Sequence, residues 1–139
     1  MILLLLGCPT ASPDTGDTGA VTEVDPDAPV IESASVSCYL HETGDRYYQW
    51  SALAAATDPQ GQSTIATFGT LAATAGEVDL GEVTLACNDG DCLGSWREGQ
   101  DISVECVNVA TYAFTFVVED KDGHASAPVT VSATQTTEP

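Results

Sequence analysis

Three aspartates in turn-like stretches are the residues whose chemistry stands out first. Asp58 opens the stretch 58–61, Asp-Pro-Gln-Gly, while Asp120 and Asp122 lie in the stretch 120–123, Asp-Lys-Asp-Gly. Turns between antiparallel strands gather at the ends of the fold, so these carboxylates could meet there. Calcium takes about six to eight oxygen ligands, many of them carboxylates. The sequence therefore offers a candidate calcium site; the alternative is that Asp simply builds the turns.

Residue combinations typical of catalysis are missing from the sequence. Its two histidines, His41 and His124, both lie in loop-like stretches. No serine lies in a Gly-x-Ser-x-Gly context, and no histidine cluster offers metal ligands. We therefore expect a protein that is not an enzyme. A small enzyme or inhibitor that uses its loops remains the alternative.

Trp96 and Arg97 form a second candidate binding feature. They lie in the stretch 94–100, which we expect to be a loop. Exposed Trp and Arg side chains are enriched among the residues that dominate protein–protein binding energies. The alternative is that this pair caps the core.

Four of the five cysteines lie in the segment that we expect to fold. Their connectivity cannot be deduced from the sequence alone. Cys87 and Cys92 flank a short turn, which favours a disulfide between them and leaves Cys38 to pair with Cys106. The rival pairing joins Cys38 to Cys87 and Cys92 to Cys106. A zinc site is a further alternative, although zinc ligands usually come as two close pairs and only one is present.

Strand patterns account for most of the chain from Val30 to Ala133. In the stretch 112–118 the residues Tyr, Phe, Phe and Val fall on alternate positions, which indicates a strand with one buried face. The segments that we expect to be strands are 30–40, 47–57, 63–71, 77–80, 83–87, 102–106, 112–118 and 127–131. Short strands at this spacing favour a sandwich or a barrel.

The charge of the chain restricts its partners. The 139 residues include 21 acidic and only three basic ones, for a formal net charge of -18. This charge repels nucleic-acid phosphates and opposes docking on anionic lipid. It is compatible with divalent cations, basic partners or solubility alone.

The N-terminus carries an apolar run, Met1–Leu6, followed by Gly7 and Cys8. The run is too short to span a bilayer. Leu5-Leu6-Gly7-Cys8 resembles the lipobox of bacterial lipoproteins, in which the signal segment, here 1–8, is cut before a cysteine that receives lipid. The resemblance implies lipid on Cys8 and a place in the bacterial cell envelope, at the outer membrane or cell surface. The run is shorter than an ordinary signal peptide, which a start codon upstream of Met1 would explain.

The segment 9–29 is rich in Pro, Thr, Asp and Gly. It contains too little apolar surface to offset the entropy of ordering, so we expect a disordered acidic linker. We also expect residues 134–139 to form a disordered tail. Five cysteines in so short an exported chain indicate disulfides and an oxidising compartment.

Two stretches of the domain 30–133 resemble a known class of modules. Residues 112–123 are similar to the final hairpin of bacterial immunoglobulin-like, PKD-type and cadherin-like domains, and residues 56–61 look like their Asp-x-x-Gly turn. The resemblance implies an antiparallel immunoglobulin-like β-sandwich of about seven strands. It also implies that the Tyr112 hydroxyl bonds to a nearby backbone group, and that acidic turns of the cadherin-like kind bind calcium.

These expectations combine into a membrane-anchored, surface-displayed binding or structural module without catalytic activity. The expected partners are membrane lipid through Cys8 and another protein or a glycan, with no nucleic acid. No cofactor is expected apart from calcium, whose binding would make the protein a calcium-dependent adhesion module.

Overall fold

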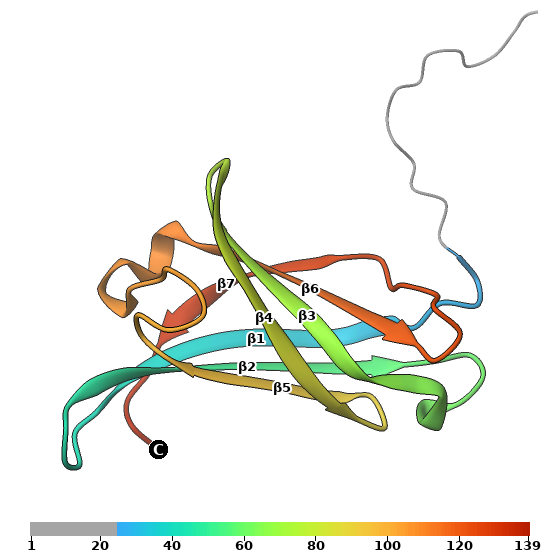
Figure 1. Ribbon diagram of the computed structural model, residues 1–139, viewed down its shortest axis with the longest axis horizontal. Helices are drawn as coiled ribbons and strands as arrows, with labels where there is room; N and C mark the ends of the chain where they lie inside the picture. The colour runs from blue at the N-terminus through green and yellow to red at the C-terminus, as the bar shows by residue number, and fades with distance from the viewer. Residues whose placement is uncertain (1–24) are drawn as a thin grey trace, which may run out of the picture.

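Strands dominate the computed structural model, which describes residues 25–139 (Figure 1). The strands are β1 (Val30–His41), β2 (Tyr47–Thr57), β3 (Ile65–Ala75), β4 (Val78–Asn88), β5 (Asp91–Arg97), β6 (Ala113–Asp120) and β7 (Val129–Gln135). Two 3-10 helices, η1 (Gln62–Thr64) and η2 (Cys106–Thr111), lie before β3 and before β6. Within this described part, no helix is long and apolar enough to cross a bilayer.

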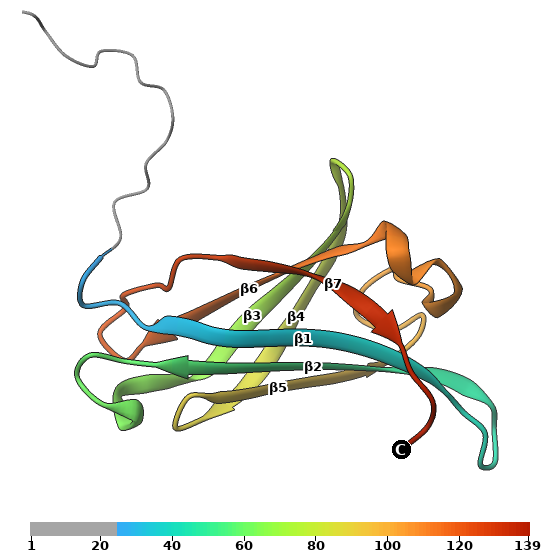
Figure 2. The same cartoon turned by 180° about the vertical axis from the view of Figure 1, so that it is seen from behind.

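The strands close into a barrel in the order β1-β2-β5-β4-β3-β6-β7. Closure depends on β1 and β7, which pair in parallel from Val36 opposite Ala133 to Cys38 opposite Gln135. The view from behind shows β7 running beside β1 (Figure 2). All other neighbouring strands are antiparallel.

The expected immunoglobulin-like sandwich is therefore wrong, although the all-β class and the number of strands are as predicted. A sandwich has two separate sheets with open edges, whereas here the sheet closes on itself. Alternating apolar residues indicate that a strand has one buried face. They do not indicate which distant strand completes the ring, because the parallel pairing of β1 with β7 links segments about a hundred residues apart.

Side chains at alternate strand positions fill the interior of the barrel, as expected for so few strands. The largest fully buried ones include Trp50, Leu71, Leu85, Phe114 and Phe116. Trp50 stacks on Trp96 with ring centroids 5.8 Å apart and lies 5.6 Å from the ring of Phe114. Near this cluster, the Tyr112 hydroxyl accepts a hydrogen bond from the backbone N–H of Glu105, 3.0 Å away.

Two disulfides join the four cysteines of the barrel. Cys38 of β1 is bonded to Cys106 of η2, and Cys87 of β4 is bonded to Cys92 of β5. This is the pairing that the short turn favoured, and it leaves no thiol of this set free for zinc. The hairpin explains the second bond, since Cys87 and Cys92 are direct partners in the antiparallel ladder.

Several predicted strands and loops differ from the structure. The expected strands 63–71 and 127–131 are β3 and β7, with bounds 65–75 and 129–135. The expected strands 77–80 and 83–87 are one strand, β4, which passes through Gly81 at a φ of 114°. The expected loop 94–100 is largely β5, because residues up to Arg97 pair with β2. The expected strand 102–106 is a loop that leads into η2. Its alternating pattern arises because Ile102, Val104 and Cys106 all point into the core from a non-strand segment.

The ends of the folded unit also extend beyond the expected 30–133. Ala28 and Pro29 of the predicted linker are buried against the barrel. Strand β7 continues to Gln135, and the Glu138 carboxylate accepts a hydrogen bond from the Glu42 backbone and lies 2.6 Å from His41 Nδ1. The predicted tail is therefore held by contacts with β1 and the residue that follows it. The predicted signal segment 1–8 and residues 9–24 of the predicted linker lie outside the described residues.

Candidate functional site

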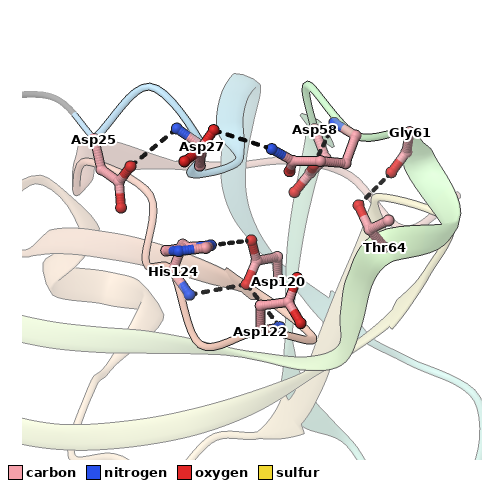
Figure 3. Close-up of polar contacts among 9 residues, drawn as sticks. Asp25, Asp27, Asp58, Gly61, Thr64, Asp120, Asp122 and His124 are labelled. Atoms are coloured by element: carbon pink, nitrogen blue, oxygen red, sulfur yellow. Dashed lines mark hydrogen bonds and ion pairs between the residues drawn. The ribbon is translucent and has the colours of Figure 1, made fainter.

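The three aspartates of the candidate calcium site lie at the same end of the barrel, where β2 and β6 finish (Figure 3). Asp58 follows β2, and Asp120 ends β6 with Asp122 in the loop beyond. Backbone contacts bring the two turns together, because the N–H of Lys121 donates to the carbonyl oxygen of Thr64, 2.8 Å away. The expectation that these turns share one end of the fold is correct.

The Asp120 carboxylate accepts hydrogen bonds from residues of its own loop. It is buried, and its Oδ1 accepts hydrogen bonds from the backbone N–H groups of Asp122 and His124 at 2.9 and 2.8 Å. Its Oδ2 lies 2.7 Å from Nδ1 of the His124 ring. The carboxylate therefore closes the turn that carries the chain from β6 toward β7.

Asp58 has an equivalent role in the turn after β2. Its Oδ1 accepts the backbone N–H of Gln60 at 2.8 Å, and its carbonyl oxygen accepts the N–H of Gly61 at 2.9 Å. Its Oδ2 is buried and has no hydrogen-bond partner within residues 25–139.

The three aspartates do not converge on one metal position. In the described part of the chain, no group of three or more His, Cys, Asp or Glu residues is placed to hold a metal ion. Asp58 and Asp120 use carboxylate oxygens to accept backbone N–H groups of their own turns, which is the turn-building role that the sequence offered as the alternative.

The Asp120–His124 pair shifts the ionisation of both partners. The hydrogen bond to Asp120 raises the pKa of His124, against a smaller opposing effect of burial. Burial alone would raise the pKa of Asp120, but hydrogen bonds from the His124 ring and backbone, with the nearby histidine charge and the Asp122 N–H, hold that pKa below its ordinary value. The pair is thus favoured as an ion pair.

An Asp–His pair could orient a general base, and covalent catalysis of the triad kind would also require a nucleophile within hydrogen-bond reach of the histidine. Ser126 lies two residues further along, but it is buried, and its hydroxyl accepts the backbone N–H of Val118 at 3.0 Å. Among the hydrogen bonds of residues 25–139, both histidines contact carboxylates and neither contacts a hydroxyl.

The predicted Trp96–Arg97 binding pair is not an exposed pair. Both residues lie on β5, where successive side chains point to opposite faces. Trp96 therefore points inward and stacks on Trp50, while the Arg97 guanidinium carbon lies 3.8 Å from the centroid of the Tyr47 ring. The prediction failed because it placed these residues in a loop, where no alternation constrains them. The alternative, a core position for Trp96, is correct.

Sequence reasoning missed an apolar row on the outside of the barrel. Leu53, Phe68 and Leu93 are 52%, 65% and 52% exposed and point away from the core. The sequence contained one indication of this row. On β3, strict alternation places Phe68 on the face opposite to the buried residues Leu71 and Ala73. The adjacency of the three positions required the register between strands.

Comparison with models of known protein families, with characterised proteins and with solved structures gives no match.

Proposed function

We propose that the protein is a lipid-anchored, non-catalytic binding module of the bacterial cell envelope, at the outer membrane or cell surface. Cys8 carries the lipid, and the acidic linker displays the barrel away from the membrane. The observation that carries this proposal is the pair of disulfides within the barrel. Structural disulfides form and persist in oxidising compartments, so they support export of the chain, as does the Leu5-Leu6-Gly7-Cys8 lipobox.

Binding rather than catalysis is supported by the chemistry of the surface. The Asp–His pair serves a turn and, within residues 25–139, forms no hydrogen bond to a hydroxyl or thiol. Exposed apolar side chains, in contrast, gather in one row on the barrel wall. Contiguous exposed apolar residues on a soluble fold are typical of interaction sites. The net charge of -18 opposes nucleic acid and is compatible with a basic partner.

Lipid attachment is tested with a Cys8→Ser variant expressed in a bacterial host behind a complete export signal. Wild-type protein is expected in the membrane fraction and labelled by radioactive palmitate, while the variant is expected unlabelled and released. Thr10→Ala, a change two residues away that retains the thiol, is the matched control and should behave as wild type. Equal labelling and equal partitioning of Cys8→Ser would contradict the proposal.

A further inference from the structure

The outward apolar row crosses four adjacent strands. Leu53 of β2 lies directly opposite Leu93 of β5, Leu93 lies opposite Ala86 of β4, and Ala86 lies opposite Phe68 of β3. Side chains directly opposite each other in a ladder have Cβ atoms about 5 Å apart. The four residues, which we call the outer row, therefore form one continuous apolar line about 14 Å long, since neighbouring strands lie about 4.8 Å apart.

A hollow lies beside the outer row at each of its ends. At the Leu53 end, small side chains such as Ser33, Ser35 and Ala55 leave a hollow of ≈ 650 Å³ beside the two leucines. At the other end, Phe68 borders a smaller hollow of ≈ 290 Å³. Side chains of another molecule could therefore insert beside the row on both sides.

Other exposed apolar residues in the described part of the chain do not form such a line. Val30, Val78 and Val107 are 48%, 61% and 67% exposed, but they lie on three separate elements: Val30 begins β1, Val78 begins β4 and Val107 lies in η2. Isolated residues of this kind are normal on protein surfaces. The outer row differs because its members are in register.

The charges beside the outer row are negative. Asp91 lines the larger hollow and Glu119 lines the smaller one, while no Lys or Arg lines either. All three basic residues of the chain are engaged elsewhere: Arg46 with Glu42, Arg97 over Tyr47, and Lys121 with the Ser63 carbonyl oxygen. A partner that covers the row must therefore tolerate or neutralise carboxylates at both ends.

A second copy of this chain does not meet that requirement. Each copy carries a net charge of -18, and both copies would bring the same carboxylates to the contact. Salt screens charges only beyond a Debye length of about 8 Å at physiological ionic strength, so repulsion within a close interface persists.

We propose that the outer row is the docking site for a basic amphipathic segment of another protein. Its apolar side chains cover Leu53, Leu93 and Phe68, while its flanking Lys or Arg residues pair with Asp91 and Glu119. Such a segment would resemble other peptides that place apolar anchors in a shallow groove. This inference rests on the proposed function, because it names the partner class of the proposed binding module.

The test measures binding of a fluorescein-labelled Leu/Lys peptide of about 14 residues, with Leu at helical spacing, to the purified full-length protein by fluorescence anisotropy. Saturable binding is expected. A Leu53→Ser/Leu93→Ser variant should weaken it at least about tenfold, since the lost contact area is apolar. The matched control is Val78→Ser/Val107→Ser, which removes equally exposed apolar side chains away from the row and should leave the Kd within about twofold.

Three results would overturn the inference: unchanged affinity in the Leu53→Ser/Leu93→Ser variant, equally tight binding of a peptide with every Leu replaced by Ser, or sedimentation showing a wild-type dimer that the variant loses. The second result would indicate charge attraction alone, and the third a second copy as occupant. Peptide-induced NMR shifts at Phe68 of the wild type provide an independent measure if the variant unfolds. The fractionation of Cys8→Ser does not depend on the outer row. A failed peptide-binding test would therefore leave the proposal of lipid anchoring intact, and a failed fractionation test would leave the docking proposal intact.

Discussion

Removing the Cys38–Cys106 disulfide is expected to destabilise the barrel more than removing Cys87–Cys92. The two bonds close loops of very different length, with sequence separations of 68 and 5. On the loop-entropy relation these separations correspond to about 4.4 and about 2.1 kcal/mol of stabilisation. The long bond ties β1 to η2 across the chain, whereas the short one joins residues that the hairpin already holds together.

Two double variants isolate this difference. Cys38→Ala/Cys106→Ala and Cys87→Ala/Cys92→Ala each remove two buried sulfurs, so each controls for the packing loss in the other. Urea unfolding followed by tryptophan fluorescence should give free energies of unfolding that differ by about 2 kcal/mol, with the first variant the less stable. Equal losses, or a greater loss in the hairpin variant, would refute the reasoning.

Three further outcomes are expected. The Asp120–His124 pair should stabilise the fold fully only between pH 3.8 and 6.5. As pH rises above this range, the stabilisation is lost because His124, whose pKa is raised in the fold, gives up its proton. As pH falls below it, the stabilisation is lost because Asp120, whose pKa is lowered in the fold, takes up a proton. The difference in melting temperature between wild type and His124→Gln should therefore be greatest near pH 5 and shrink on both sides; a difference independent of pH would contradict the pairing. Gly90→Ala should be roughly 2 kcal/mol more destabilising in thermal melts than Gly123→Ala. Both positions have φ above 90°, but only at Gly90 would an added Cβ clash with a backbone oxygen, that of Ala56, so equal losses would contradict this clash. Calcium should raise the melting temperature no more than magnesium at equal ionic strength, because the three turn aspartates do not converge; a calcium-specific rise of several degrees that Asp120→Asn abolishes would restore the metal site.

Local features of the sequence predicted the structure well. The stretch 47–57 is a strand with the predicted bounds, and the last two strands pair as the expected hairpin. The turn between Cys87 and Cys92 predicted the disulfide between them, and the pairing of Cys38 with Cys106 was then predicted by elimination. For both hairpins, the signal that allowed the prediction is a short turn sequence between two strands.

The features that could not be predicted depend on pairing between strands that lie far apart in the sequence. Gly94 and Ser95 weaken the strand pattern of β5, which forms because Trp96 and its neighbours pair with β2. Closure of the barrel likewise depends on β1 meeting β7, and the outer row depends on the register of four strands. Alternation along one strand contains no information on either.

The proposed lipid-anchored module requires the protein to be exported, lipidated and oxidised. Intact mass spectrometry tests it on protein extracted from the membranes of an expressing bacterium and treated with a thiol-alkylating reagent without reduction. We expect a chain that begins at Cys8, carries the added mass of lipid and contains no alkylated thiol. An unlipidated chain that retains residues 1–7, with its cysteines alkylated, would contradict it.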